Sequence, residues 1–345
     1  MGRVDRYTEE DIDSVRVERQ GVVEWFITAR STRHGVPVAV LLDRWLCAHP
    51  AVAAVWQFSV GYFAGIGVTG GVKWPNVCIG SAGAEGVSSA FLHGVEGAEP
   101  ERLLLNGRVV GSGFRDYAAR YVWLGPFESK GRSVHGNKTS GSVFGQIGDC
   151  LSSAGTGFRN LVRTWFFLRD IGSSYDTFNA ERLASYDAVG IAHGVLPSST
   201  GVGSCDPRSA DIVAACMAVI PSAQGVTVRA ITSPAQCPPA SYGSHFSRAL
   251  EVRTPDHRRL MVSGTASIGT DGKTLDASDP RKQISNTLDA VDAILRAGGV
   301  KWGEITSAVA YLRDNDLLDQ VCGRCTERGL DPRSLLAARA AICRP

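Results

Sequence analysis

The amino-acid sequence predicts a layered protein, α/β or α+β, in which one strand–helix unit occurs twice. Strands and helices alternate from about residue 103 onward, which is typical of both layer architectures. Landmarks also repeat: Ala154-Gly155 is followed by Arg169-Asp170, and Ala297-Gly298 by Arg313-Asp314, at intervals that differ by one residue. Such an internal repeat indicates one architecture used twice. The chain has 345 residues, 44% hydrophobic and 20% charged, which is ordinary for a globular protein of one or two domains.

The first hundred residues have a weaker pattern. Residues 38–49 are expected to form a helix that opens after Pro37, and residues 52–63 either a strand or a buried helix. Glycine-rich loops are expected at 65–71 and 80–86. Gly65, Gly67 and Gly70 have the spacing of a dinucleotide-binding fingerprint, but no helical period follows them. No nucleotide cofactor is therefore expected.

The two repeated units have the clearest pattern. In the first unit we expect a strand at 121–124, a helix at 140–153, a strand at 158–168 and a helix at 177–189. In the second we expect a strand at 259–265, helices at 280–297 and 317–328, and a strand at 305–312; residues 335–341 have a helix-like pattern. A Pro/Ser/Gly-rich segment at 196–203 separates the units. The chain is therefore expected to divide into 1–196 and 197–345.

The strand that ends at residues 263–265 is the best candidate for a binding edge. Apolar and polar residues alternate before it, and Arg248 interrupts this alternation because it falls on the apolar face. The strand ends in Ser263-Gly264-Thr265, where the glycine allows another molecule to approach the backbone. The same glycine equally fits a strand bulge that binds nothing.

Composition and charge exclude several classes of function. A net charge of +2 favours neither nucleic acid nor an anionic membrane as the main partner. The apolar runs at 36–45 and 51–66 are too short or too interrupted to span a bilayer, and residues 1–19 do not have the pattern of a signal peptide. The nine cysteines are odd in number and scattered, which favours the reducing cytoplasm. Cys322 and Cys325 form a lone CxxC, and the seven histidines form no i, i+4 pair, so no metal is expected.

The order of motifs resembles a known superfamily. One succession of elements in the second unit resembles the Rid (YjgF-like) superfamily. It consists of a strand, Ser-Gly, a helix near Gln283, Ala-Gly, a strand ending Leu-Arg-Asp and a second helix. Two such units in one chain resemble the chorismatase family, as do the segments 196–204 (LPSSTGVGS), 242–243 (YG), 245–248 (HFSR), 262–267 (VSGTAS) and 342–344 (ICR). The resemblance runs from about residue 121 to the C-terminus. It implies an α+β fold with two Rid-like halves, each a mixed sheet covered on one face by helices. The half at about 121–190 would be degenerate, and the half at 197–345 would carry the substrate pocket.

The resemblance also implies a reaction and a substrate. Chorismatases convert chorismate, a small dianion, into pyruvate and either 3-hydroxybenzoate or a dihydroxycyclohexadiene carboxylate, without a cofactor. By position, Tyr242 would donate a hydrogen bond to a substrate carboxylate and Arg248 would neutralise it, because a guanidinium binds carboxylates through two N–H groups. Arg163 in the first half and Arg313 in the second match further arginines of the family.

Three more positions belong to the implied site. Gly264 and Thr265 would line it at the strand end. Gly264 together with Cys343 resembles the family branch that makes 3-hydroxybenzoate. In the family, a short apolar strand carrying the general-acid glutamate follows the Cys-Arg pair, and here that position falls after Pro345. The second half is therefore expected to lack its last strand, and the chain as given is expected to be impaired in the acid-catalysed step.

Two other functions remain open. The first is a Rid-type deaminase that hydrolyses imines, for which trimers with sites between subunits are typical. The second is a non-catalytic homologue that binds a small molecule, which the absent glutamate favours. A monomer or a small homo-oligomer is expected in every case.

Overall fold

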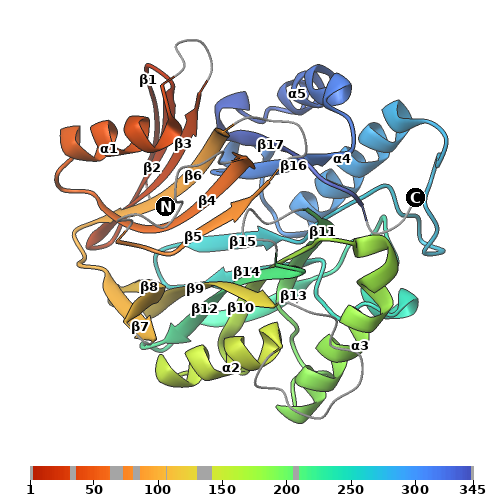
Figure 1. Cartoon of the computed structure of the whole chain (residues 1–345), viewed down its shortest axis with the longest axis horizontal. Coiled ribbons are helices and arrows are strands. Elements are labelled where there is room, and N and C mark those ends of the chain that lie inside the picture. The colour runs from red at the N-terminus through yellow and green to blue at the C-terminus, as the bar shows by residue number, and fades with distance from the viewer. Residues whose placement is uncertain are drawn as a thin grey trace.

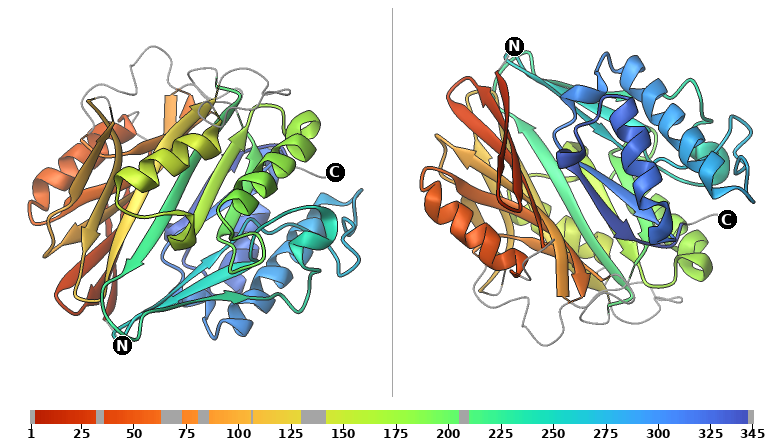
Figure 2. Two further views of the ribbon diagram at one scale, coloured as in Figure 1. Left: turned by 90° about the horizontal axis from the view of Figure 1, so that it is seen from below. Right: turned by 90° about the horizontal axis from the view of Figure 1, so that it is seen from above.

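The computed structural model of the chain describes residues 3–31, 36–62, 73–80, 86–105, 107–129, 142–204 and 210–342. Mixed sheets face the centre of the molecule and helices cover them from outside (Figures 1 and 2). The α+β fold class predicted from the sequence is thereby confirmed. The described elements form three consecutive units, and the first two each contain a six-stranded sheet.

Unit 1 occupies the part of the chain whose sequence pattern is weakest. It contains β1 (Val4–Glu9), β2 (Ile12–Arg19), β3 (Val22–Arg30), α1 (Val38–Ala48), β4 (Ala53–Tyr62), β5 (Asn76–Ile79) and β6 (Gly86–Glu96). The strand order is β1-β2-β3-β6-β4-β5, in which β5 is parallel to β4, and β6 is antiparallel to both β3 and β4. The expected helix after Pro37 is α1, and the ambiguous segment is the strand β4. The expected glycine-rich loop at 65–71 lies outside the described residues.

Unit 2 repeats this topology. It contains β7 (Glu101–Leu105), β8 (Arg108–Arg115), β9 (Ala119–Ser129), α2 (Val143–Ser153), β10 (Leu161–Leu168), α3 (Ile171–Ala188), β11 (Ser198–Gly203) and β12 (Ile212–Pro221). Its order is β7-β8-β9-β12-β10-β11, with β11 parallel to β10, and β12 antiparallel to both β9 and β10. This sheet continues past residue 197, so β11 and β12 belong to the same sheet as β9 and β10.

Unit 3 has the same succession of elements up to its fifth strand, within the described residues, and its strands form two separate sheets. It contains β13 (Thr227–Ile231), β14 (Ala249–Arg253), β15 (Arg258–Val262), α4 (Pro280–Ala297), β16 (Ala308–Leu312), α5 (Leu318–Glu327) and β17 (Leu335–Arg339). β13, β14 and β15 form an antiparallel sheet, and β16 and β17 a parallel pair. The succession β15-α4-β16-α5-β17 matches β9-α2-β10-α3-β11 in unit 2. The predicted repeat of strand, helix, strand and helix is therefore present.

Local sequence explains most of these boundaries. Asp279 accepts hydrogen bonds from the backbone N–H groups of Arg281 and Lys282, and Pro280 occupies the first turn, so α4 begins where the pattern predicts. The helix-like interpretation of 335–341 is wrong, because Leu335–Arg339 pairs with β16 as the parallel strand β17. Leu and Ala are among the best helix formers, but intrinsic propensity is only a weak preference, and pairing in the tertiary structure overrides it here. Short 3-10 helices lie at Phe158–Asn160, Pro239–Tyr242, Trp302–Glu304, Asn315–Leu317 and Pro332–Ser334.

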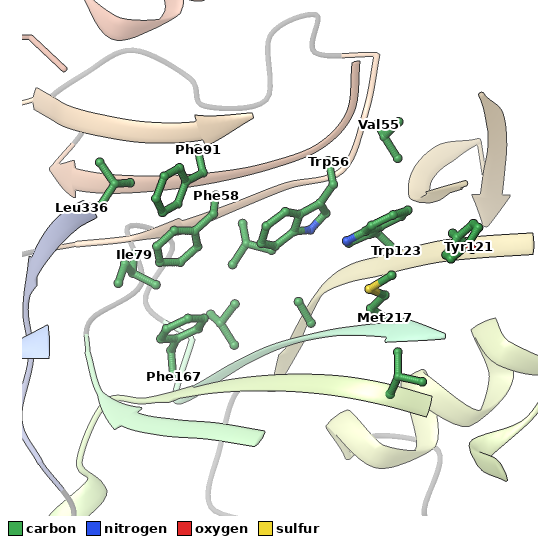
Figure 3. Close-up of a cluster of buried hydrophobic side chains, with 14 of the residues drawn as sticks. Val55, Trp56, Phe58, Ile79, Phe91, Tyr121, Trp123, Phe167, Met217 and Leu336 are labelled. Carbon is green, nitrogen blue, oxygen red and sulfur yellow. The ribbon is translucent and has the colours of Figure 1, made fainter. Parts of the chain in front are cut away.

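Residues of all three units share one central core. Trp56 from β4, Trp123 from β9, Phe167 from β10 and Leu336 from β17 pack in the same buried cluster (Figure 3). The alternate positions of the unit 2 strands, such as Leu124, point to the other face and pack under α2 and α3. The sheets are thus apolar on both faces, as expected for strands buried between helices and a core.

Within the described residues, no helix has the length and hydropathy needed to cross a bilayer.

Candidate functional site

A cavity of about 1530 Å³ extends through the interior, and part of it lies between units 2 and 3. Ligand pockets are usually roughly 300–1,000 Å³, so this one has room for more than a small molecule. Between units 2 and 3 its lining brings together residues from β10, β11, the segment before β14 and the segment after β15: Arg163, Ser199, Thr200, Tyr242, Arg248, Ser263, Gly264 and Thr265.

Arg163 on β10 is a buried cation beside this cavity. Only 8% of the residue is exposed, and its Nη2 donates a hydrogen bond of 2.5 Å to Oγ1 of Thr200. Its guanidinium lies 5.0 Å from the ring centre of Trp165, while Nη1 finds no hydrogen-bond acceptor among the described residues. Burial lowers the pKa of Arg163 to about 10, and no described carboxylate offsets that effect. A buried cation without a counter-ion is costly, so this position favours the binding of an anion.

Arg248 is the second buried arginine of the site, 4% exposed. It lies one residue before β14, where Nε and Nη2 donate hydrogen bonds of 3.3 and 2.8 Å to the carbonyl oxygen of Cys237. Its guanidinium lies 5.5 Å from the ring of Tyr242 and 5.7 Å from that of Phe246. The structure therefore places Tyr242 and Arg248 together, as the sequence predicts. No ion pair of Arg248 is present in the described part of the chain.

Gly264 connects unit 3 to unit 2 at the wall of the cavity. Its N–H donates to the carbonyl oxygen of Ser199 at 2.9 Å, and a β-carbon added to Gly264 would lie 3.4 Å from Cα and Cγ2 of Thr200. That is close to ordinary van der Waals contact, and the backbone of Gly264 is not left-handed, so the fold does not demand a glycine here. The neighbouring Ser263 donates to Ser247 and accepts from the N–H of Ser199, which fixes this edge.

The remaining predicted positions have different environments. Thr265 lines the cavity and donates a hydrogen bond of 3.0 Å to the carbonyl oxygen of Ser263. Arg313, just after β16, also borders the cavity, but it is exposed and therefore lies at the rim. Cys343 falls outside the described residues. The arginines Arg163 and Arg248 are thus the buried cations of the predicted set.

The structure adds Arg182, which the sequence analysis does not single out. It lies on α3, is 2% exposed, borders the cavity and donates to Oδ1 of Asn179. Its guanidinium lies 5.6 Å from the ring of Phe246, which is also close to Arg248. A sequence signal exists: Phe178, Arg182 and Tyr186 follow one another at intervals of four, so the arginine falls within the buried stripe of its helix.

A second group of charges borders the same cavity where units 1 and 3 meet, but there the cations have carboxylate partners. Arg19 pairs with Glu24, and Arg259 contacts both oxygens of Glu24 at 2.5 and 2.6 Å. His93 lies 2.9 Å from the same carboxylate. Burial opposes ionisation of Glu24, but Arg259 and the hydrogen bond from His93 hold its pKa well below the usual range. Arg163 differs from these cations, because no described carboxylate pairs with it, and this favours its surroundings as the place for an external anion.

The described carboxylates whose pKa is shifted include no candidate for a general acid. An acid needs a raised pKa, whereas the carboxylates with shifted pKa values are all shifted downward: Glu24, Glu101, Glu251, Asp256 and Asp331. Within the same residues, no group of three or more His, Cys, Asp or Glu side chains could hold a metal ion.

Comparisons with known proteins bear on the fold. No protein-family model matches the chain, and no curated protein matches it significantly. Among solved structures, the chain is similar to the crystal structure of a chorismatase, with 21% identity and a TM-score of 0.66 over 84% of this chain and 89% of that one. Over 34% of its length the chain is also similar to yeast Mmf1, with 17% identity, 91% of that chain covered and a TM-score of 0.26. Over the same share of its length it is similar to E. coli TdcF with bound serine, with 13% identity, 90% of that chain covered and a TM-score of 0.26. The first likeness shows that the chain has the fold seen in chorismatase; the other two are too weak to bear on the fold.

Proposed function

We propose that the cavity between units 2 and 3 binds chorismate and that the protein is a chorismatase-like enzyme releasing pyruvate. The observation that carries this proposal is Arg163, a buried guanidinium with an N–H group that no described residue accepts. The fold shared with a chorismatase over 84% of the chain supports it. The motifs at 242–248 and 262–267, which resemble that family, lie around the same cavity.

The two arginines account for a substrate with two carboxylates. Arg163, already oriented by Thr200, offers Nη1 to one carboxylate, and Arg248 with Tyr242 offers a cation and a phenol to the other. Trp165 and Phe246 provide apolar surface for the ring of the substrate. Binding in this buried place strengthens both charge-assisted hydrogen bonds, because water is excluded.

The chemical step needs a proton on the enolpyruvyl group before the ether bond can break. The described carboxyl groups offer no acid with a raised pKa for this transfer. We therefore assign this role to none of these carboxyl groups. The same observation favours a second candidate function, a homologue that binds the dianion without converting it.

The choice of product is proposed from Gly264 and Cys343. We expect the absence of a β-carbon at Gly264 to let the ring lie deeper against this strand end. This pair resembles the branch that forms 3-hydroxybenzoate, so we expect mainly 3-hydroxybenzoate, and we expect the double variant Gly264→Ala with Cys343→Ala to shift products toward the diene while pyruvate release continues. A cytoplasmic location and a monomeric or small oligomeric state also remain predictions.

Incubation with chorismate tests the proposal. Pyruvate is followed by reduction with lactate dehydrogenase, the aromatic and diene products are separated by chromatography, and chorismate binding is measured by calorimetry. Pyruvate release that is lost in Arg163→Met but kept in Arg44→Met, an exposed arginine on α1, supports the enzyme. Binding without pyruvate supports the second candidate. Neither binding nor pyruvate overturns both.

A further inference from the structure

A largely buried cluster of charged and titratable side chains joins units 1, 2 and 3. We call it the Glu24 cluster, and its members are Arg19, Glu24, His93, Asp116, Asp256 and Arg259. Glu24 on β3 is at its centre, with 1% of its side chain exposed, and contacts three of the other members. Arg19 also pairs with Asp116 in the turn between β8 and β9, and its Nε lies 3.7 Å from Asp256 in the turn between β14 and β15.

Arg259 is the member that connects Glu24 to a strand of unit 3. It lies on β15 in the hairpin β14–β15, and its Nη2 donates to both carboxylate oxygens of Glu24 at 2.5 and 2.6 Å. The hairpin also packs Leu250, Val252 and Met261 against the central core. Apolar contacts are non-directional, whereas a charge-assisted hydrogen bond requires a short distance and good alignment. The pair therefore restrains the hairpin along its strand direction in a way that the apolar contacts do not.

Strand β15 carries this restraint to the candidate site. Ser263 follows Arg259 by four positions, which is about 13 Å along an extended strand. There the N–H of Ser263 donates to the carbonyl oxygen of Arg248 at 2.9 Å, which joins the end of β15 to the residue before β14. A shift of the hairpin would therefore move Ser263 and Arg248 together.

The end of β15 also contacts the strand that orients Arg163. Gly264 donates to the carbonyl oxygen of Ser199 on β11 at 2.9 Å. Thr200, the next residue of β11, accepts the hydrogen bond of Arg163. Hydrogen bonds weaken steeply when their geometry departs from the ideal. The spacing between the buried arginines Arg163 and Arg248 therefore depends on where the hairpin lies.

We propose that Glu24 is a positioning residue of the candidate site, which acts through Arg259 and β15 on the placement of Arg248 relative to Arg163. Within the described part of the chain, Glu24 pairs with no residue of the predicted site, so its effect on a ligand is indirect. A dianion that bridges two cations is sensitive to their spacing, because each charge-assisted hydrogen bond has its own geometric requirement. The effect on chorismate affinity rests on the proposed function, whereas the placement of β15 by Glu24 does not.

Three variants of the whole protein separate positioning from stability. Glu24→Gln removes the carboxylate that holds Arg259. Asp116→Asn is the matched control, because it removes an equally buried carboxylate from the same cluster and leaves the pair of Glu24 and Arg259 intact. The double variant Glu24→Gln with Arg259→Met removes both charges of that pair, so in urea unfolding it should regain stability relative to Glu24→Gln alone. It should not regain the wild-type placement of the strand end.

Hydrogen exchange at the amides of Ser263 and Gly264 measures this placement without any ligand. We expect both amides to exchange roughly 2- to 30-fold faster in Glu24→Gln and in the double variant, which is the range for coupling through a contact network. Both should exchange at the wild-type rate in Asp116→Asn. In calorimetry, the dissociation constant for chorismate should rise within the same range in the first two variants and stay unchanged in Asp116→Asn.

Several outcomes would overturn the proposal. Wild-type exchange in Glu24→Gln, or equally fast exchange in Asp116→Asn, would do so. Wild-type exchange in the double variant would also do so, since it assigns Glu24 to stability alone; if Glu24→Gln does not fold, the double variant is compared with Asp116→Asn directly. Faster exchange with an unchanged dissociation constant would refute the effect on Arg248. Faster exchange in a protein whose wild type binds no chorismate would support the placement of β15 by Glu24 and overturn the proposed function instead.

Discussion

Replacing Arg163 by methionine is expected to leave the unliganded protein about as stable as the wild type and to weaken its binding of chorismate. Burial lowers the pKa of Arg163 from its usual value to about 10, which corresponds to a cost of about 3 kcal/mol for keeping it charged. Methionine removes that cost, together with the hydrogen bond to Thr200, worth roughly 1.5 kcal/mol, and the contact with Trp165, worth roughly 1 kcal/mol. The net change in unfolding free energy is therefore within about 1 kcal/mol, on the side of stabilisation.

The affinity moves in the opposite direction. Loss of a charge-assisted hydrogen bond to a carboxylate costs roughly 1.5–3 kcal/mol, so the dissociation constant for chorismate should rise about tenfold to about a hundredfold. Urea unfolding measures the first quantity and isothermal titration calorimetry the second. Arg44→Met is the matched control, because that arginine is exposed on α1 and should change neither quantity by more than about 0.5 kcal/mol.

The pH dependence of stability adds a further check. Above about pH 10 the unfolded chain holds a proton on Arg163 that the folded protein has lost, so wild-type stability rises with pH relative to Arg163→Met. Below the folded pKa the difference is constant. A loss of 3–5 kcal/mol in the variant, as expected when one partner of a buried ion pair is removed, combined with unchanged affinity, would refute the assignment of Arg163 to anion binding.

Other variants test the rest of the account. Arg248→Ala should weaken chorismate binding by about 1.5–3 kcal/mol and Tyr242→Phe by less, because only a hydroxyl is lost; equal affinities in calorimetry would disprove their placement. Gly264→Ala should cost less than about 1 kcal/mol of stability, because the new methyl group meets Thr200 at 3.4 Å, but it should alter the product ratio seen in chromatography. Glu24→Gln should cost about 3–5 kcal/mol in urea unfolding, since Arg259 loses its carboxylate and Arg19 keeps only Asp116 and Asp256. The contribution of Glu24 is present above about pH 4.5 and is lost as the pH falls, so a constant difference between wild type and variant down to about pH 2 would contradict it.

The elements that the sequence predicts best are those with both a periodic apolar face and a defined start. Helix α4 spans Pro280–Ala297, as predicted, because its apolar stripe and its Asp279 cap are both local features. Strand β17 is the opposite case. Leu335–Arg339 has no alternation, and only its pairing with β16 makes it a strand.

The burial of Arg248 was predictable, because a charged side chain falls there on the apolar face of a strand. Arg248 on an apolar face is a local anomaly in the sequence, and it is buried beside Tyr242. Arg182 shows the limit, because its approach to Phe246 depends on how α3 lies against unit 3. The similarity of units 1 and 2 was equally hidden, since it resides in strand order, which local patterns do not specify.

The most direct test of the central claim is a crystal structure of the protein with chorismate bound at saturating concentration. Our account predicts one substrate carboxylate within hydrogen-bond distance of Nη1 of Arg163 and the other beside Arg248 and Tyr242. Substrate bound instead at Arg19 and Arg259, where the cations already have a carboxylate, or a cavity left without substrate, would contradict it.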